Sequence, residues 1–582
     1  MGQEKLKQWK KFSAVLWCLF LSLSLALVLG CSSSDDNAFF ILPERTVEVE
    51  AGNATLTCAD KGDIVACRGI PYAEPPVGDL RFAQPEPRLL EGNIRATSFG
   101  SACIQDDGSG SEDCLFLNVF FPKDTEPGDN LPVMVWIHGG ALIQGASSVP
   151  GYDLPALVKE GVIVVTINYR LNAFGFLPHP ALEDPTGNFG LKDQVAALEW
   201  VKDYIEDFGG NPDNVTIFGE SAGGHSVLSL MVSSQRNSGL FHKAIVQSGS
   251  YSPEQTALGA GYYILGSFFG DLNGYPDVVP GFPPTGAGPC SGTNEEIRAC
   301  LRNLTTDEVM DIQLATPTWG WISPVAGDAG LITNTFLPKS IATALNDGND
   351  GDVANVPVMI GSNLHEGTLF TALFMADYNS FASLEDLENG VVTLLVADPR
   401  PYSRYVVAEK YTDEAAAIYG DNVNKYRNAH SMIFTDATFS CNALAHAGAL
   451  AAAGRPTYSY WFTDADAPIN PTYSTLGFLS SLFNFGAWGV GAVHSFEIQY
   501  IFGTVQTHPD VTPAQRNLSD RMIAYWTNFA KEGEPGDEWT AYDGTNIRDL
   551  NPAGDKDATA VDFATAHYCA CWADPEACTW VD

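Results

Sequence analysis

Short apolar runs recur along this chain, and segments with helical periodicity separate them. The runs are VMVWI (133–137), VIVVTI (162–167), VTIF (215–218), AIVQ (244–247), VPVMI (356–360) and YSYWF (458–462). Apolar runs of about four to eight residues bounded by turn-forming residues predict buried β-strands. Between them, residues 190–207 place their apolar side chains on one helical face. This alternation predicts an α/β fold with a large, mostly parallel sheet covered by helices on both faces.

Length and composition favour one large domain. The chain has 582 residues, of which 45% are hydrophobic and 11% aromatic, enough for a deep core. After residue 43 no tract rich in Pro, Gly or Ser is long enough to separate two folded halves, so we expect a single domain over residues 44–582. The formal net charge of −39 disfavours nucleic acids and anionic membrane surfaces as partners.

The N-terminus has the pattern of an export signal. Four lysines precede an apolar run from Phe12 to Leu29, and the sequence LGCSSSDDN follows. Small Gly30 before Cys31 resembles the lipobox of bacterial lipoproteins, in which the cysteine becomes the lipidated N-terminus. We therefore expect a signal peptide at 1–30, lipidation of Cys31 and a tether over 31–43. An ordinary secretory signal and a retained membrane helix are the alternatives.

The cysteine count is consistent with export. Without Cys18 and Cys31, ten cysteines remain, and an even number in an exported chain permits five disulfides. The close pairs 58/67 and 290/300 favour local bridges. The CAC sequence near the end has no second cluster with suitable histidine spacing, so no metal site is predicted.

One pentapeptide points to nucleophilic catalysis. Residues 219–223 read GESAG, a G-x-S-x-G pattern directly after a predicted strand and before a predicted helix. Such a turn exposes its serine, here Ser221, and the helix N-terminus that follows directs its amides at a developing oxyanion. A structural glycine turn is the alternative interpretation. A second glycine turn after a strand, WIHGGAL (136–142), would supply further oxyanion donors and makes that alternative weaker.

A serine nucleophile also needs a base and an acid. The chain order Ser, acid, His, which is common where G-x-S-x-G forms the nucleophile turn, leaves five candidate bases: His430, His446, His494, His508 and His567. Glu366 follows the predicted strand at 356–360 and is the candidate acid. His494 lies in the glycine-lined segment GVGAVHSFEIQY, which favours it among the five.

Several longer motifs resemble those of the type-B carboxylesterase/cholinesterase family over about residues 47–572. They are RGIPYAEPPVGDLRF (68–82), EDCLFLNVFFP (112–122), VMVWIHGGAL (133–142), NYRLNAFGFL (168–177), GNFGLKDQVAALEWV (187–201), NPDNVTIFGESAGGHS (211–226), SNLHEGT (362–368) and HSFEIQYIFG (494–503). The resemblance implies an α/β-hydrolase fold, with insertions forming the gorge of the active site. It also implies a serine esterase that needs neither metal nor cofactor.

The same resemblance assigns roles to individual residues. It makes Ser221 the nucleophile, Glu366 the triad acid and His494 the base. It places the oxyanion amides at Gly140, Ala141 and Ala222. It implies the disulfides Cys103–Cys114, Cys290–Cys300 and Cys441–Cys569, whereas the pairs Cys58–Cys67 and Cys571–Cys578 follow from proximity alone. It also implies that Arg81–Glu112 and Arg170–Asp193 are buried ion pairs and that Glu220 tunes the site.

Three positions depart from the family pattern. His225 stands where the family usually has a small residue, Ser495 replaces a common Gly, and Gln499 replaces a common Pro. The substrate expectation comes from the loop between Cys103 and Cys114, which reads IQDDGSGSED and has no aromatic residue. Quaternary ammonium groups are held by aromatic faces, so we expect neutral aryl or alkyl esters to be preferred over choline esters. A non-catalytic cholinesterase-like adhesion domain, and a lipase or amidase using the same triad, are the alternatives.

Overall fold

The computed structural model describes most of the chain from residue 45 onward. The described ranges are 45–152, 156–272, 288–316, 322–327, 334–347, 351–374, 383–387, 404–419, 425–468 and 491–573. The predicted signal peptide, the tether and Cys31 lie outside these ranges, as does Cys578. Within them, no helix combines the length and the hydropathy needed to cross a membrane.

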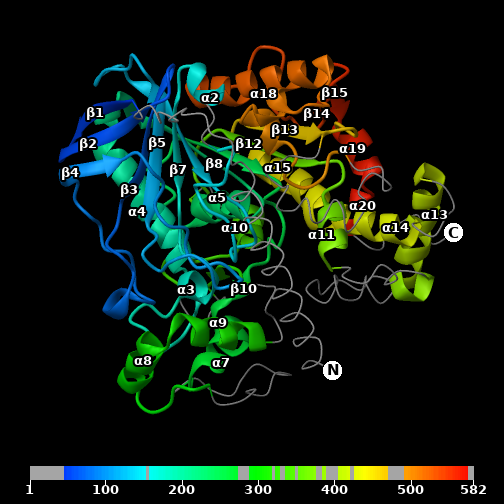
Figure 1. Ribbon diagram of the computed structural model, residues 1–582. Helices are drawn as coiled ribbons and strands as arrows, with labels where there is room; N and C mark the ends of the chain where they lie inside the picture. The colour runs from blue at the N-terminus through cyan, green and yellow to red at the C-terminus, as the bar shows by residue number, and fades with distance from the viewer. Residues whose placement is uncertain are drawn as a thin grey trace, which may run out of the picture. The chain divides into compact units, whose positions relative to one another are not determined.

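A large mixed sheet forms the centre of this domain. Its strand order is β1-β2-β3-β5-β7-β6-β8-β9-β12-β13-β14-β15, with β4 pairing to β2, and Figure 1 shows this order as a change from blue to red across the sheet. The strands are β1 (Thr46–Ala51), β2 (Asn53–Asp60), β3 (Ile64–Pro71), β4 (Glu91–Ala96), β5 (Phe116–Pro122), β6 (Leu131–Ile137), β7 (Ile163–Ile167), β8 (Gly210–Glu220), β9 (Lys243–Gln247), β12 (Val358–Asn363), β13 (Thr457–Phe462), β14 (Asn546–Leu550) and β15 (Lys556–Thr559). All pairings from β7 to β14 are parallel.

All six predicted strands are present, as β6, β7, β8, β9, β12 and β13. Each lies in the parallel centre of the sheet, where both faces are covered, and continuous apolar runs are typical of such strands. The outer strands from β1 to β5, and β15, pair antiparallel with their neighbours except for β4. The α/β-hydrolase prediction is therefore confirmed, with a mixed edge added to the parallel sheet.

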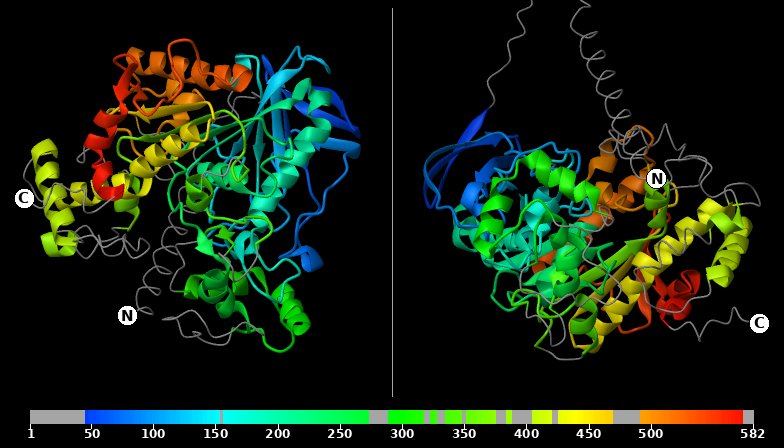
Figure 2. Two further views of the ribbon diagram at one scale, coloured as in Figure 1. Left: turned by 180° about the vertical axis from the view of Figure 1, so that it is seen from behind. Right: turned by 90° about the horizontal axis from the view of Figure 1, so that it is seen from below.

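The two faces of the sheet pack against different helices (Figures 1 and 2). Along β6, Val133, Val135 and Ile137 belong to the buried cluster that also contains residues of α4 (Phe189–Tyr204), α5 (Ala222–Val232) and α15 (Cys441–Ala452). The alternate residues Met134 and Trp136 pack with α17 (Ile498–Ile501) and α18 (Pro513–Glu532). This alternation follows from the two-residue period of a strand, and it gives the domain a hydrophobic core on each face.

The ends of α18 follow from its sequence. The Thr512 hydroxyl accepts a hydrogen bond from the backbone N–H of Gln515, the Gln515 side-chain oxygen accepts one from the backbone N–H of Thr512, and Pro513 occupies the first turn. This is a capping box with proline where no N–H is needed. At the other end Gly533 adopts φ 83°, the left-handed conformation that glycine enters without strain. These caps fix the position of α18, which packs beside β6 and β8.

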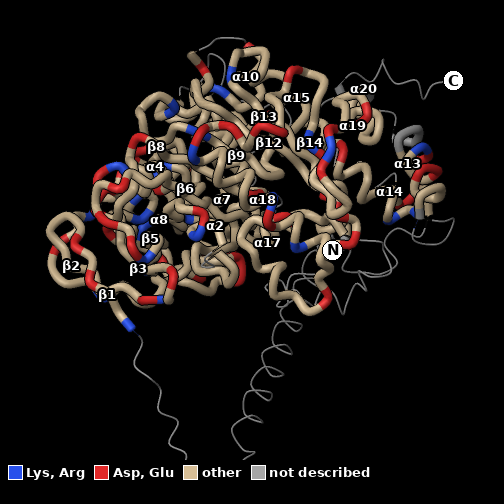
Figure 3. Tube along the Cα trace, turned by 90° about the horizontal axis from the view of Figure 1, so that it is seen from above, with Lys and Arg blue, Asp and Glu red and all other residues tan. Residues whose placement is uncertain are grey.

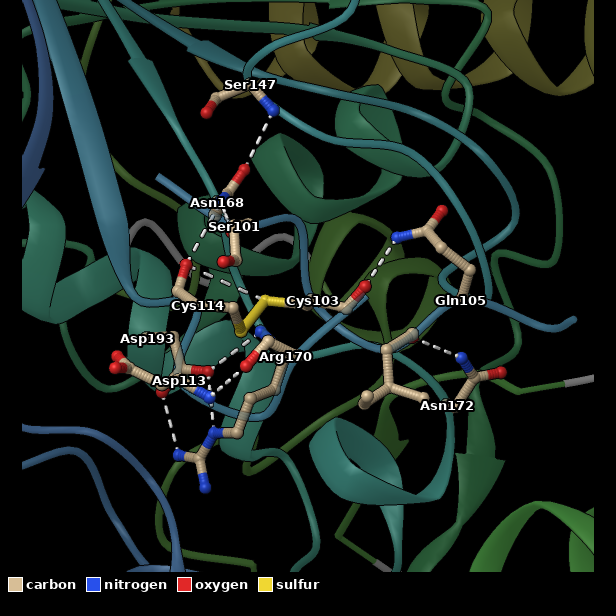
Figure 4. The surroundings of a disulfide bond; sticks show 12 residues. Ser101, Cys103, Gln105, Asp113, Cys114, Ser147, Asn168, Arg170, Asn172 and Asp193 are labelled. Atoms are coloured by element: carbon tan, nitrogen blue, oxygen red, sulfur yellow. Dashed lines mark hydrogen bonds and ion pairs between the residues drawn. A yellow bond between two sulfur atoms is a disulfide. The ribbon is translucent and has the colours of Figure 1, made fainter. Parts of the chain in front are cut away.

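Four disulfides hold the described chain: Cys58–Cys67, Cys103–Cys114, Cys290–Cys300 and Cys441–Cys569. These four predictions are confirmed, whereas the pairing of Cys571 with Cys578 lies outside the described residues. Figure 4 shows the surroundings of one bridge: Asn168 donates to the backbone oxygen of Cys114 at 3.0 Å and to that of Ser101 at 2.9 Å. The side chain of Asn168 thus ties the short disulfide loop to the end of β7.

Both predicted ion pairs are present, but only Arg170–Asp193 is fully buried, whereas Arg81–Glu112 is partly exposed. Arg170 and Asp193 are almost completely buried and form a bidentate pair, with Nε–Oδ2 and Nη2–Oδ1 distances of 2.8 and 2.7 Å (Figure 4). Arg81 pairs with Glu112 through two nitrogens. Elsewhere, acidic positions are spread over many helices and strands rather than gathered in one segment (Figure 3).

Candidate active site

Ser221 occupies the sharp turn between β8 and α5. Its backbone has φ 56° and ψ −122°, a conformation that costs a non-glycine residue about 1–3 kcal/mol. Its N–H donates to the backbone oxygen of Gln247 at the end of β9, at 2.9 Å. Neighbouring strands therefore hold the strained turn at the carboxyl edge of the sheet, where open α/β sheets place their functional residues.

The glycines on either side of Ser221 are required by close packing against β6. A Cβ on Gly219 would lie 2.6 Å from the oxygen of Ile137, and one on Gly223 would lie 1.9 Å from the same oxygen. Neither position can carry a side chain without moving α5 away from the sheet. The G-x-S-x-G pattern is thus a steric requirement of this turn.

The glycine turn after β6 lies against Ser221. A Cβ built on Gly139 would approach the Cβ of Ser221 to 3.1 Å. The next residues, Gly140 and Ala141, have φ 108° and 54°, and a Cβ on Gly140 would lie 2.2 Å from the oxygen of Gln144. The predicted oxyanion residues Gly140 and Ala141 therefore share one tightly turned loop, and Ala222 begins α5 beside it.

Glu366 follows β12 and is completely buried. Its Oε1 accepts the backbone N–H of Asn363 at 2.7 Å and the hydroxyl of Ser248. Its Oε2 lies 2.5 Å from Nδ1 of His494. Carboxylate contact at Nδ1 orients an imidazole and leaves Nε2 for a reacting group. The structure therefore brings together the acid and the histidine that the sequence placed 128 residues apart.

The other ring nitrogen of His494 is buried and has no hydrogen-bond partner within the described ranges. It lies 3.2 Å from Oε1 of Glu220, the residue before Ser221. Burial raises the pKa of Glu220 well above 4.5. Burial acts to lower the pKa of His494, but Glu220 and Glu366 outweigh it and raise that pKa above 6.5.

A third carboxyl group, that of Glu497, lies close to this pair, although no sequence motif predicted a role for it. Asn363 donates to its Oε2 at 2.6 Å and Gln247 donates to its Oε1 at 3.0 Å. Burial and then the charge of Glu366 raise the pKa of Glu497 to about 7. Glu497 lies three residues after His494, in the turn that precedes α17 (Ile498–Ile501), and this closeness in sequence is the only signal that could have indicated it.

Aromatic rings surround the histidine. Phe370 of α11 (Gly367–Phe374) and Phe439 each lie 4.9 Å from the His494 ring, centroid to centroid. Phe439 also contacts Tyr251, and Tyr251 stacks on His225 at 4.8 Å. Burial lowers the pKa of His225 to about 4, so this departure from the family pattern adds a neutral ring to the aromatic cluster around Tyr251.

The two other departures follow His494 in the sequence. Ser495 has φ 70°, a conformation that favours glycine, and its hydroxyl donates to the backbone oxygen of His494. Gln499 donates to the backbone oxygen of Pro468 at 2.8 Å. Both substitutions therefore act on the local backbone.

The four alternative histidines have partners away from Glu366. Nδ1 of His430 contacts Thr371, that of His446 contacts Ser250, that of His508 accepts from Asp510, and that of His567 lies 2.6 Å from Asp436. Within the described residues, no cluster of three or more His, Cys, Asp or Glu side chains could hold a metal ion. The chemistry that this arrangement can support is nucleophilic attack by a serine with a histidine as base.

Comparison with known proteins agrees with this geometry. A sequence model of the Carboxylesterase family matches residues 50–572. The chain is 32% identical over 539 residues to acetylcholinesterase of Danio rerio, which covers 85% of this chain and 81% of the relative. It is 34% identical over 502 residues to para-nitrobenzyl esterase of Bacillus subtilis strain 168, which covers 82% of this chain and 88% of the relative. With a match that includes both the serine turn and the Glu366–His494 pair, the chain belongs to the carboxylesterase family.

Proposed function

We propose that this protein is a serine carboxylesterase that works through an acyl-enzyme with Ser221 as nucleophile. The observation that carries the proposal is the contact of 2.5 Å between Glu366 and His494 beside a strained serine turn. Each part has a chemical use: the turn presents the hydroxyl, the imidazole takes its proton, and the carboxylate stabilises the imidazolium that results.

The first half of the reaction forms the acyl-enzyme. Nε2 of His494 accepts the proton of Ser221 while Oγ bonds to the ester carbonyl carbon, and the carbonyl electron pair moves onto oxygen. The backbone N–H groups of Gly140, Ala141 and Ala222 stabilise that oxyanion, a contribution of about 3–4 kcal/mol for each donor. The intermediate collapses as His494 returns the proton to the departing alcohol oxygen.

The second half regenerates the enzyme. Water enters in place of the alcohol, His494 accepts one of its protons, and the resulting hydroxide attacks the acyl carbon. Collapse of the second tetrahedral intermediate breaks the bond to Ser221 Oγ, which regains a proton from His494. The products are the carboxylic acid and the free enzyme.

Trapping the acyl-enzyme tests this proposal. A p-nitrophenyl phosphonate should bond covalently to the Ser221 peptide, displacing p-nitrophenol, and intact-mass analysis should show one adduct per chain. Peptide mapping locates the modified residue, and Ser221→Ala is the matched control. An adduct on another residue, or equal labelling of the control, would contradict the assignment.

For substrate class we propose neutral aryl and alkyl esters rather than choline esters. The similarity to both acetylcholinesterase and para-nitrobenzyl esterase leaves both kinds of substrate open. Long-range attraction by the negative charge would speed the arrival of a cation, but salt screens it over about 8–10 Å. Retention needs an aromatic face, worth on the order of 1–2 kcal/mol when desolvated, and the Cys103–Cys114 loop has no aromatic residue.

The corresponding measurement is kcat/KM for a choline ester and for its uncharged carbon isostere at physiological salt. We expect the isostere to be hydrolysed at least as efficiently. A clear preference for the choline ester would mean that an aromatic residue elsewhere holds the cation. Turnover of emulsified lipid or of amides above that of soluble esters would instead favour the lipase or amidase alternative.

We also propose that the protein is exported and anchored by a lipid on Cys31. The four disulfides support an oxidising compartment, because such bonds seldom persist in the cytosol. Mass spectrometry of the N-terminal peptide should find a diacylglyceryl modification at Cys31, and Cys31→Ala should release the protein from the membrane. Recovery of the wild-type protein in the soluble fraction would contradict the anchor.

A further inference from the structure

Gln247 connects three parts of the active site. It is the last residue of β9 and completely buried, and it pairs with Glu220 of β8 and Gly361 of β12. Its backbone oxygen accepts the N–H of Ser221 at 2.9 Å. Its side chain points at Glu497, which makes Gln247 a direct link between the nucleophile turn and that carboxyl group.

The orientation of the Gln247 amide is set by Trp526 of α18. An indole N–H can only donate, and Nε1 of Trp526 lies 3.0 Å from Oε1 of Gln247. The amide oxygen must therefore face the indole, and the amide nitrogen must face Oε1 of Glu497, 3.0 Å away. Without the indole N–H, both orientations of the amide become available.

Asn363 fixes the other side of the same carboxyl group. Its Nδ2 donates to the backbone oxygen of Val493 at 2.9 Å and to Oε2 of Glu497 at 2.6 Å. Both amide hydrogens are thus used, and both Glu497 oxygens face N–H donors. A protonated carboxyl would direct its own hydrogen at one of these donors, whereas a carboxylate accepts from both.

We propose that Trp526 is a positioning residue that, through the orientation of the Gln247 amide, holds Glu497 as a carboxylate beside the Glu366–His494 pair. The inference rests on the proposed function, since the charge matters through the base His494. Trp526 itself lies on a helix that packs on the far face of the sheet from α5, and it acts only through Gln247.

The charge of Glu497 affects several neighbouring titratable groups. Glu497 interacts with the carboxyl groups of Glu366 and Glu220 and with His494, and the hydroxyls of Tyr460 and Tyr152 lie within its field. Burial raises its pKa to about 7, and the two amide donors oppose that rise. Because this pKa lies near 7, the loss of one hydrogen-bond donor is enough to change the charge of Glu497 near neutral pH.

Trp526→Phe tests the inference because it removes the N–H and keeps an aromatic ring against Tyr460, which contacts Trp526 edge-on. Loss of charge on Glu497 lowers the pKa of His494. The acid limb of kcat/KM should therefore move to lower pH by roughly 0.5–1 unit, part of the one to three units that a neighbouring charge commonly contributes. Activity at alkaline pH, where Glu497 is ionised in both proteins, should change little.

Trp200→Phe is the matched control. Trp200 is buried in α4, and its Nε1 has no hydrogen-bond partner within the described part of the chain. The substitution Trp200→Phe therefore removes the same atoms as Trp526→Phe without removing a hydrogen bond, and the pH profile of this variant should match that of the wild type. In a Glu497→Gln background, Trp526→Phe should cause no further shift, because no charge remains to be held. Gln247→Met gives a second route to the same shift.

A uniform loss of kcat at every pH, or an equal shift in the Glu497→Gln background, would overturn the inference and leave Trp526 a packing residue. Titration of the His494 ring by NMR in histidine-labelled protein gives a readout that needs no turnover. Its midpoint should fall in Trp526→Phe and stay unchanged in Trp200→Phe. Absence of esterase activity in the wild type would refute the proposed function, whereas an active enzyme without these shifts would refute only the role of Trp526.

Discussion

Opening the Cys441–Cys569 disulfide should destabilise the protein more than opening any of the three other described bridges. It closes a loop with a sequence separation of 128, whereas Cys103–Cys114 closes one of 11. Loop-closure entropy predicts a loss of about 5 kcal/mol for the long loop and about 3 kcal/mol for the short one at 25 °C. Contributions that are common to the removal of either disulfide cancel in this comparison, so the difference of about 2 kcal/mol reflects loop length.

Double alanine variants of each pair test this estimate. All four cysteines are buried, so each variant leaves a comparable small cavity and the short-loop variant is the control. Equilibrium unfolding in urea, followed by tryptophan fluorescence with the remaining disulfides intact, gives the two free energies of unfolding. A long-loop loss no larger than the short-loop loss would refute the entropic reasoning or the bond itself.

Three further results are expected. Asp193→Asn leaves Arg170 buried without a counter-charge and should cost roughly 3–5 kcal/mol in thermal or chemical unfolding, whereas Lys159→Ala, at an exposed pair, should cost no more than about 1 kcal/mol. The acid limb of the kcat/KM profile should have its midpoint above pH 6.5, because a protonated His494 cannot accept the serine proton and neighbouring carboxyls raise its pKa; a midpoint at or below 6.5 would contradict this. Glu366→Gln should lower kcat by less than removal of Ser221 or His494, measured with the same ester, and a larger loss would give Glu366 a different role.

Most of the fold was predictable because the central strands carry continuous apolar runs. The runs at 133–137 and 215–218 became β6 and β8, and the helical face at 190–207 became α4. The outer strands were not predicted. β1 reads TVEVEA, whose alternation fits a strand with one exposed face, and β15 reads KDAT, a polar edge strand; neither contains the continuous apolar run that marks the central strands.

The site was predictable where local sterics leave a mark in the sequence. Gly219 and Gly223 flank Ser221 because a side chain at either position would collide with β6. The carboxyl of Glu497 and its partners Gln247 and Trp526 left no such mark. Their contacts join positions separated by 250 and 279 residues, so only the folded sheet reveals them.

The most direct test of the account is kcat/KM for p-nitrophenyl acetate in Ser221→Ala relative to the wild type. Alanine is small enough to occupy the strained turn in place of serine, and an unfolding curve checks that the variant is folded. If Ser221 is the nucleophile, the ratio should fall by roughly 10⁴–10⁶-fold. A folded Ser221→Ala protein with near wild-type activity would contradict the proposed mechanism at its centre.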